Sequence, residues 1–389
     1  MPRGITKRYI KRFYADKSNK GEMTQENIDW LFKLKNEVPM FLDKLKGEKQ
    51  SGFFHYSLTG DLYTQDKNWG LGNTVFAVKI YYTLDMLDSL PEVEREDMVN
   101  FIKSFPREDG SIFDPLVNNK ASFRNKAGSI INLDFSNFLG EKTKRAEARQ
   151  AFSALMLMNS TPKRPYLKIP CTSEEVEKYL RSLNWKKPWA AGAHFSTLLF
   201  FLHVNKKQFN VCENAEELIE YVIDWVNKLQ SPDDGSWYVG HNVSVHEKIN
   251  GAMKVITGLS AVDKLNFRYP EKLIDLCLSV DKDEHACDSV DKIYVLHYAN
   301  KLTGGNYRYN EIEDFCYKQL EAYKEHYFPD IGGFSFYKHR ANQYYYGAKI
   351  TKGLDEPDIH GTVLFLWSIA MISQILNIDK DLGFKEFIT

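Results

Sequence analysis

The chain has 389 residues and carries 51 Lys and Arg against 52 Asp and Glu, a formal net charge of −1. This balance gives no reason to expect a polyanionic partner, so nucleic acid is not an expected ligand. Hydrophobic residues make up 43% of the sequence and aromatic residues 14%, which is ample for a substantial core. No uninterrupted apolar run approaches the ~20 residues of a membrane span, so no transmembrane segment is expected.

The length exceeds the ~100 to 200 residues that are usual for one domain. No Gly/Ser-rich, Pro-rich or like-charge tract divides the chain. We therefore expect an N-terminal helical extension (residues 1–50) packed on one large domain (residues 51–389).

The first 21 residues contain no apolar core of a secretory signal. The five cysteines are scattered, without a Cys-x-x-Cys pair, at Cys171, Cys212, Cys277, Cys287 and Cys316. Such an arrangement is more typical of a reducing compartment than of a disulfide scaffold. We expect a cytoplasmic protein.

Six segments are apolar nearly all round, which is typical of helices that are buried on every side. In chain order they are residues 72–87, 147–159, 192–204, 248–262, 288–302 and 358–372. The charged segments between them, such as 174–183 and 310–326, are amphipathic and suit an outer position. This alternation predicts an all-α fold, a single (α/α)6 toroid with long loops at one mouth.

Four segments share the end of an amphipathic helix, a turn and then an aromatic or large apolar residue. They are residues 99–115, 178–192, 220–237 and 321–336. Recurrence of one such unit along a chain indicates a helical repeat.

The third unit resembles the repeat of the terpenoid cyclase and protein prenyltransferase superfamily. That repeat has an aromatic-aliphatic pair, three residues, a glutamine and then Gly-x-Trp. The matching residues here are Trp225, Val226, Gln230, Gly235 and Trp237. As architecture the resemblance spans roughly residues 50 to 375. It implies an α/α toroid that acts on an isoprenoid or prenyl diphosphate in its central cavity.

Class II cyclases of that superfamily carry an Asp-x-Asp-Asp signature, whose middle aspartate protonates the substrate. The corresponding stretch here is residues 285–288, in which only Asp288 is kept and Cys287 replaces the acid. A thiol with a pKa near ~8.5 is far too weak an acid to protonate an alkene. Asp288 or Asp291 could replace it only if burial raised its pKa.

The start of the last apolar segment supplies the other candidate catalytic residues, Asp358 and His360. Helix N-termini carry partial positive charge and unpaired N–H groups, which suit anions. Because Asp288 and His360 each lie at the start of an inner helix, we expect their side chains to point into a shared pocket.

Zinc is the cofactor that the resemblance makes possible, since prenyltransferases hold zinc with an Asp, a Cys and a His. The sequence "DIHGT" (358–362) resembles the Asp-x-Tyr-His-Thr pattern that carries the histidine, with one residue displaced. Cys287, Asp288 and His360 would supply the three ligand types of a catalytic zinc site.

The segment 338–361 has three consecutive tyrosines and no helical or strand period. Long ordered loops of this kind are often functional. We expect it to close one mouth of the barrel and to contact the substrate through Arg340, Tyr344, Tyr345 and Tyr346. Further expected substrate contacts are Trp69, His194, Trp237, His241 and Asn250.

Two other functions remain open, because sugar-processing α/α toroids have a similar layout. A polysaccharide lyase needs a Tyr or His base and an Arg or Asn that neutralises a carboxylate. His241, Asn250, Arg340, Tyr345 and His360 offer those groups. The third reading is a toroid that binds a ligand or partner without catalysis. An aromatic and aliphatic cavity lining would favour a polyene, and a charged and amide lining an oligosaccharide.

Overall fold

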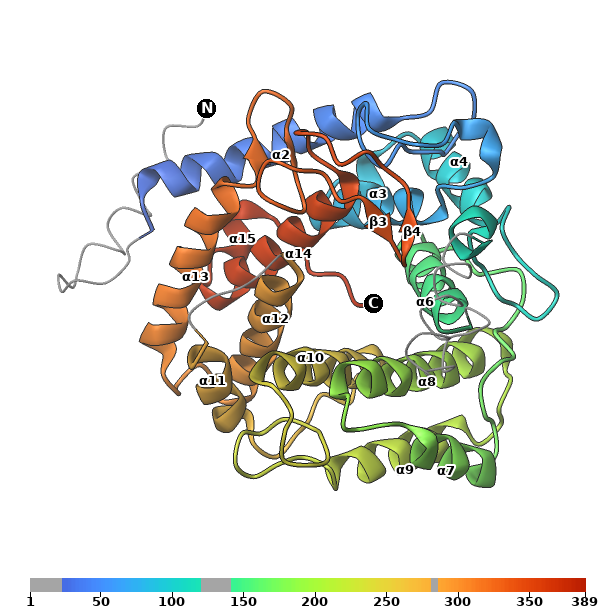
Figure 1. The fold of residues 1–389 in the computed structure, drawn as a ribbon, viewed down its shortest axis with the longest axis vertical. Helices are drawn as coiled ribbons and strands as arrows, with labels where there is room; N and C mark the ends of the chain where they lie inside the picture. The colour runs from blue at the N-terminus through green and yellow to red at the C-terminus, as the bar shows by residue number, and fades with distance from the viewer. Residues whose placement is uncertain (1–22, 120–140, 281–285) are drawn as a thin grey trace.

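Two kinds of helix alternate along the chain in the computed structural model, which describes residues 23–119, 141–280 and 286–389 (Figure 1). The first kind is largely buried and mostly apolar, except for the charged first half of α6. It comprises α3 (Leu71–Thr83), α6 (Glu141–Leu157), α8 (Pro188–Phe209), α10 (Val245–Ala261), α12 (Ala286–Leu302) and α14 (Ile359–Ile375). Each of these helices lies on one of the six segments predicted from the sequence, and the fold is all-α.

Helices of the second kind bury one face only. They are α2 (Gln25–Leu45), α4 (Glu92–Ile102), α7 (Ser173–Ser182), α9 (Ala215–Asn227), α11 (Pro270–Leu278) and α13 (Tyr309–Lys324). In α9, Leu218, Val222 and Val226 are buried while Glu217 and Glu220 are exposed. This spacing of three to four residues is that of a helix whose one stripe faces a core.

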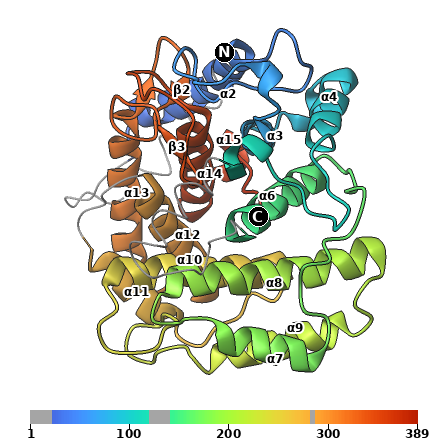
Figure 2. The same cartoon turned by 45° about the vertical axis from the view of Figure 1, so that its right-hand side comes forward.

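The apolar helices contact one another in chain order. Helix α3 packs against α6, α6 against α8, α8 against α10, α10 against α12 and α12 against α14, and α14 packs against α3. Figure 1 shows them around a central space, with the second kind of helix on the outside. The view in Figure 2 likewise places α7 and α9 outside α8.

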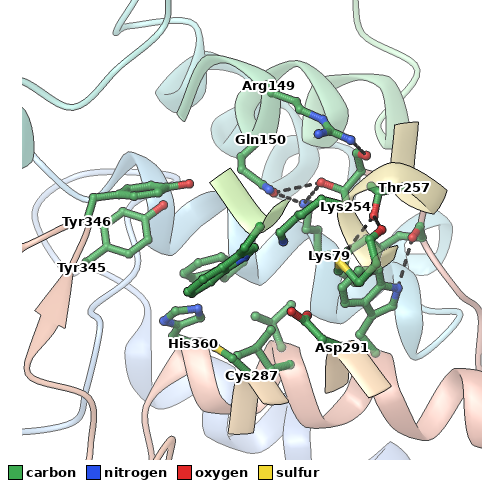
Figure 3. Close-up of a pocket in the computed structure, with 18 of the residues that line it drawn as sticks. Lys79, Arg149, Gln150, Lys254, Thr257, Cys287, Asp291, Tyr345, Tyr346 and His360 are labelled. Atoms are coloured by element: carbon green, nitrogen blue, oxygen red, sulfur yellow. Dashed lines mark hydrogen bonds between the residues drawn. The ribbon is translucent and has the colours of Figure 1, made fainter. Parts of the chain in front are cut away.

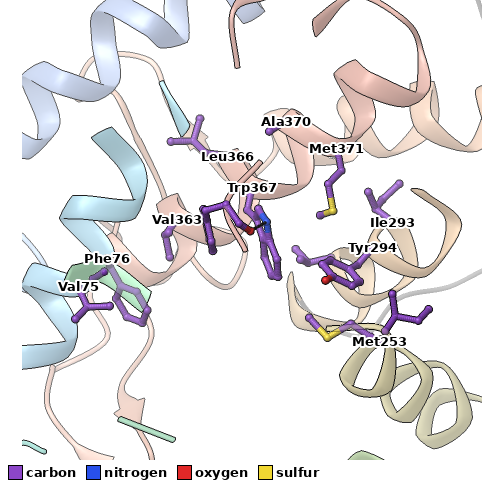
Figure 4. Packing of buried hydrophobic residues seen from close by; sticks show 14 of the residues in the cluster. Val75, Phe76, Met253, Ile293, Tyr294, Val363, Leu366, Trp367, Ala370 and Met371 are labelled. Carbon is purple, nitrogen blue, oxygen red and sulfur yellow. Dashed lines mark hydrogen bonds between the residues drawn. The ribbon is translucent and has the colours of Figure 1, made fainter. Parts of the chain in front are cut away.

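Side chains of α3, α10, α12 and α14 meet in the hydrophobic core (Figure 4). Trp367 of α14 packs on Tyr294 of α12, with ring centroids 5.2 Å apart. Short elements complete the described structure. Strand β1 (Tyr327–Phe328) pairs antiparallel with β2 (Gly333–Phe334), and β3 (Tyr344–Tyr345) pairs antiparallel with β4 (Ala348–Lys349). The remaining elements are the single-turn 3₁₀ helices η1 (Gln65–Lys67) and η2 (Leu87–Ser89) and the short helix α15 (Asp379–Leu382).

Four helices of the second kind, α2, α4, α9 and α13, are each followed by a tight turn that antiparallel backbone pairing closes. The pairs are Lys46 with Phe54, Pro106 with Ile112, Gln230 with Trp237, and Tyr327 with Phe334. In each turn a glycine with positive φ lies two residues before the pair closes: Gly52 (75°), Gly110 (76°), Gly235 (75°) and Gly332 (96°). Three of the four predicted units have this turn. The unit at 178–192 lacks it, and the first turn, after α2, was not predicted.

These glycines lie against the backbone of a neighbouring segment, so that a Cβ atom would overlap a carbonyl oxygen. The distance would be 2.2 Å from Gly52 to Asp97, 1.7 Å from Gly110 to Pro165, 2.6 Å from Gly235 to Tyr269, and 2.0 Å from Gly332 to Glu37. The contacted carbonyls belong to α4, to the segment before α7, to the residue before α11, and to α2. Each turn therefore packs its backbone against that of another outer unit, and the last reaches back to the first.

A disulfide joins Cys171 to Cys212, with Cα atoms 5.4 Å apart. The expectation that the cysteines are unpaired is therefore wrong for these two. They lie just before α7 and α9, and because these helices pack side by side, residues 41 apart in sequence meet. Cys277 and Cys316 are buried thiols.

We expect Cys171→Ser to lower the free energy of unfolding by about 4 kcal/mol under oxidising conditions, because a disulfide that closes a loop of this length restricts the unfolded chain. Denaturant unfolding with and without reductant measures the effect. Reduced wild-type protein serves as the control and should match the variant. Equal stability of oxidised and reduced wild type would contradict the prediction.

Within the described part of the chain, no helix is both long enough and apolar enough to cross a bilayer.

Candidate functional site

A cavity of about 310 Å³ lies within the central space, and all six apolar helices contribute side chains to it (Figure 3). The turn between β3 and β4 and the last described residues, after α15, complete its lining. Because each helix contributes only a few residues, the cavity depends on packing of segments that are far apart in sequence.

Aromatic rings form much of the wall. The lining includes Phe76, Trp189, Tyr344, Tyr345, Tyr346, Trp367 and Phe387. The rings of Tyr345 and Tyr346 are 4.5 Å apart, and Phe76 meets Tyr345 edge-on at 5.7 Å. Trp189 and Tyr344 are 43% and 42% exposed, so these two rings also reach the surface. The structure thus brings all three tyrosines of the predicted loop to the cavity.

Three cationic side chains, Lys79, Arg149 and Lys254, line the same cavity. Lys79 is only 2% exposed, and burial lowers its pKa well below the usual value, with further lowering from the charges of Arg149 and Lys254. Burial also lowers the pKa of Arg149 to about 10. Among the described lining side chains only Asp291 is acidic, and an anionic ligand here would favour the charged forms of all three cationic groups.

Sequence reasoning did not propose Lys79 or Lys254 as ligand contacts. Lys79 and Lys254 lie inside apolar helices, where an isolated lysine in the sequence gives little indication of which way it faces. The available signal was a single positive charge within a segment that is otherwise apolar all round, as in "FAVKIYY" (76–82). Such a charge is costly to bury without a partner.

The last described residues occupy part of the cavity. Phe387 stacks on Trp367 with centroids 4.8 Å apart, and the Trp367 indole N–H donates to the Phe387 carbonyl at 3.2 Å. The Arg149 guanidinium donates to the backbone oxygen of Thr389, and Lys79 donates to the Thr389 hydroxyl at 3.3 Å. Protein oxygen atoms therefore already lie at two of the three cations.

His360 lines the cavity at the start of α14. Its ring stacks on Phe76, with centroids 4.8 Å apart and planes 8° from parallel. Its Nδ1 lies 3.0 Å from the hydroxyl of Tyr56 and 3.3 Å from Nδ2 of Asn342. Burial lowers its pKa to about 4, so the imidazole is neutral at neutral pH.

Asp358 does not line the cavity. It is fully buried, and its carboxylate accepts hydrogen bonds from the backbone N–H groups of Gly361 (2.8 Å), Phe336 (2.8 Å) and Asn342 (3.0 Å). Burial raises its pKa to about 6. Its role in the structure is to cap α14 and to hold the preceding loop against that helix.

The expected convergence of Asp288 and His360 is not found in the cavity lining. Asp288 is buried and accepts a hydrogen bond from Nδ2 of Asn250 at 3.4 Å. Asp288 and Asn250 both lie outside the cavity lining, whereas His360 belongs to it. Cys287 and Asp291 do line it. The reason is helical geometry, since residues four apart share a face while the next residue is turned by about 100°.

The side chains do not fit a zinc site. No group of three His, Cys, Asp or Glu side chains in the described ranges is placed to hold a metal ion. Cys287 and His360 line the cavity, but Asp288, the third expected ligand, does not.

The remaining predicted contacts lie outside the cavity lining. Trp69 and Trp237 are core residues, packed on Phe53 and Phe267. His194 lies with Arg145 and Tyr179 at the start of α8. His241 is exposed, and Arg340 is exposed and stacked on Tyr337.

The chain matches no protein-family model, and no curated protein matches it significantly.

Proposed function

We propose that the six apolar helices are the inner ring of an (α/α)6 toroid, with the loops around 52–73 and 338–361 at one mouth. The support is the strict alternation of apolar and amphipathic helices together with the contact of the last apolar helix with the first. A closed ring of this kind encloses a central cavity to which every inner helix contributes, as the lining residues do here.

The ligand that best suits this cavity is an isoprenoid with a diphosphate or similar anionic group. One observation carries this proposal: three cations and seven aromatic rings line a single cavity. Lys and Arg bind phosphate oxygens through charge-assisted hydrogen bonds. The rings offer apolar surface for the prenyl chain, and their faces stabilise positive charge on carbon.

The corresponding reaction is ionisation of a prenyl diphosphate. When the carbon–oxygen bond breaks, its electron pair stays on the diphosphate, whose charge Lys79, Arg149 and Lys254 would stabilise. The allylic cation that remains would face the rings of Tyr345, Tyr346 and Phe76. Asp291 lies in the same lining and could accept a proton from that cation.

We expect farnesyl diphosphate to bind at least tenfold more tightly than either farnesol or inorganic diphosphate alone, because only the whole molecule uses both parts of the cavity. Quenching of tryptophan fluorescence should report the binding, since Trp189 and Trp367 line the cavity. Equal affinity for farnesol, or no binding of any of the three, would contradict the proposal.

An enzyme acting on acidic oligosaccharides is the second candidate. It is favoured by the exposed rings of Trp189 and Tyr344, since exposed rings at a site mouth are well placed to pack on a polar ligand. Incubation with polyuronates would test it through the ultraviolet absorbance of the unsaturated product of a lyase. Ligand binding without turnover would instead support a non-catalytic toroid.

A further inference from the structure

We infer that His360 presents a fixed Nε2–H donor to an oxygen of the ligand in the cavity, and that Tyr56 and Asn342 are positioning residues that hold this tautomer. The ligand oxygen rests on the proposed function, whereas the tautomer rests on the hydrogen bonds of the protein alone.

The orientation of the Asn342 amide is fixed by backbone groups. Its Oδ1 accepts from the N–H of Tyr344 at 3.2 Å, and its Nδ2 donates to the C=O of the same residue at 2.9 Å. Because the polarity of backbone groups is known, the reversed amide would place donor against donor and acceptor against acceptor. The Asn342 Nδ2 is therefore a donor on its other side too.

On that side, Nδ2 of Asn342 lies 3.1 Å from the Tyr56 hydroxyl and 3.3 Å from Nδ1 of His360. The buried Tyr56 oxygen accepts from Asn342, which leaves its own hydrogen to be donated to His360 Nδ1 at 3.0 Å. Nδ1 thus faces the hydrogen of the Tyr56 hydroxyl and must be an acceptor. In a neutral imidazole the hydrogen is then on Nε2.

The carboxylate of Asp358 holds the loop that carries Asn342 against the start of α14, which carries His360. Asp358 accepts from the backbone N–H of Asn342 and from that of Gly361, next to His360. Phe76 fixes the plane of the imidazole by stacking. The lowered pKa of His360 agrees with this assignment, since protonation would place Nδ1–H against the hydroxyl hydrogen of Tyr56.

The second ring nitrogen of His360, Nε2, is the one left to bind a ligand. His360 belongs to the cavity lining, and within the described part of the chain its Nε2 makes no hydrogen bond to protein (Figure 3). A neutral N–H fixed in this way can bind an anionic oxygen or stabilise charge that develops on it. It cannot act as a base through Nδ1, which is already an acceptor for Tyr56.

Nitrogen NMR of protein labelled at its ten histidines tests the tautomer without any ligand. The signals of His360 are those that disappear in His360→Gln. We expect an unprotonated Nδ1 and a protonated Nε2 in the wild type, and a mixture of tautomers in Tyr56→Phe. A hydrogen on Nδ1 in the wild type would overturn the assignment, and an unchanged tautomer in Tyr56→Phe would overturn the positioning role of Tyr56.

Farnesyl diphosphate tests the ligand contact. His360→Leu should weaken its binding about tenfold to a hundredfold, the range for a hydrogen bond to a charged group. His360→Gln keeps a donor at a similar distance and should restore most of the affinity. If the wild type and His360→Leu bind equally well, the contact is wrong while the proposed function stands. If the wild type does not bind at all, the proposed function fails, and the nitrogen signals still decide the tautomer.

Discussion

Gly332→Ala is expected to lower the free energy of unfolding by about 3 kcal/mol or more. Gly332 has φ 96°, where a side chain costs about 1 to 2 kcal/mol. In addition, the new Cβ would lie 2.0 Å from the carbonyl oxygen of Glu37, an overlap that only movement of the turn or of α2 can relieve. Denaturant unfolding followed by circular dichroism measures the loss.

Gly305→Ala is the matched control. Gly305 has φ 74°, but a Cβ there would meet nothing within 4 Å. Only the backbone penalty of about 1 to 2 kcal/mol should remain. Equal losses of unfolding free energy in the two variants would show that a Cβ atom at position 332 does not overlap the backbone of α2.

Lys254→Met is expected to weaken binding of farnesyl diphosphate by about tenfold to a hundredfold, as expected for a lost charge-assisted hydrogen bond. Lys254 lines the cavity close enough to Lys79 to lower its pKa. It forms no hydrogen bond or ion pair with the described residues, so its charge is available to a ligand. Fluorescence titration of both proteins gives the ratio of affinities.

Two controls separate the charge from general damage. Binding of farnesol, which has no anionic group, should be unchanged in Lys254→Met. Lys272→Met removes an exposed lysine of α11 and should leave both ligands unaffected. A parallel loss of farnesol and farnesyl diphosphate binding would mean that Lys254 shapes the cavity without binding the anion.

Most of the helical arrangement could be predicted because an apolar helix with no polar stripe is distinctive in sequence. The helix ends were less certain: α3 stops at Thr83, since the chain turns at Asp85, which has φ 58°. The turn after α2 was missed because "KGEKQSGFF" has no Asp-Gly pair. The unit at 178–192 was included on its tryptophans, although it has no glycine at the turn.

The candidate site was predictable only where composition was unusual, as in the run Tyr344 to Tyr346. Which of Asp288 and Asp291 faces the cavity depends on the rotation of α12, and the sequence does not state that rotation. The network of Tyr56, Asn342 and His360 joins residues up to 304 positions apart. Only tertiary packing creates such a contact.

The contact between α3 and α14 has a consequence for synthesis of the protein on the ribosome. After α3 has been translated, roughly 290 residues must follow before α14 is complete, which takes about 15 to 60 s at ordinary rates of translation. Throughout that interval the apolar flank of α3 that α14 will cover has no partner in the chain. The early helices therefore need protection from aggregation while they wait, and we expect the nascent chain to be bound by chaperones until its last helices emerge.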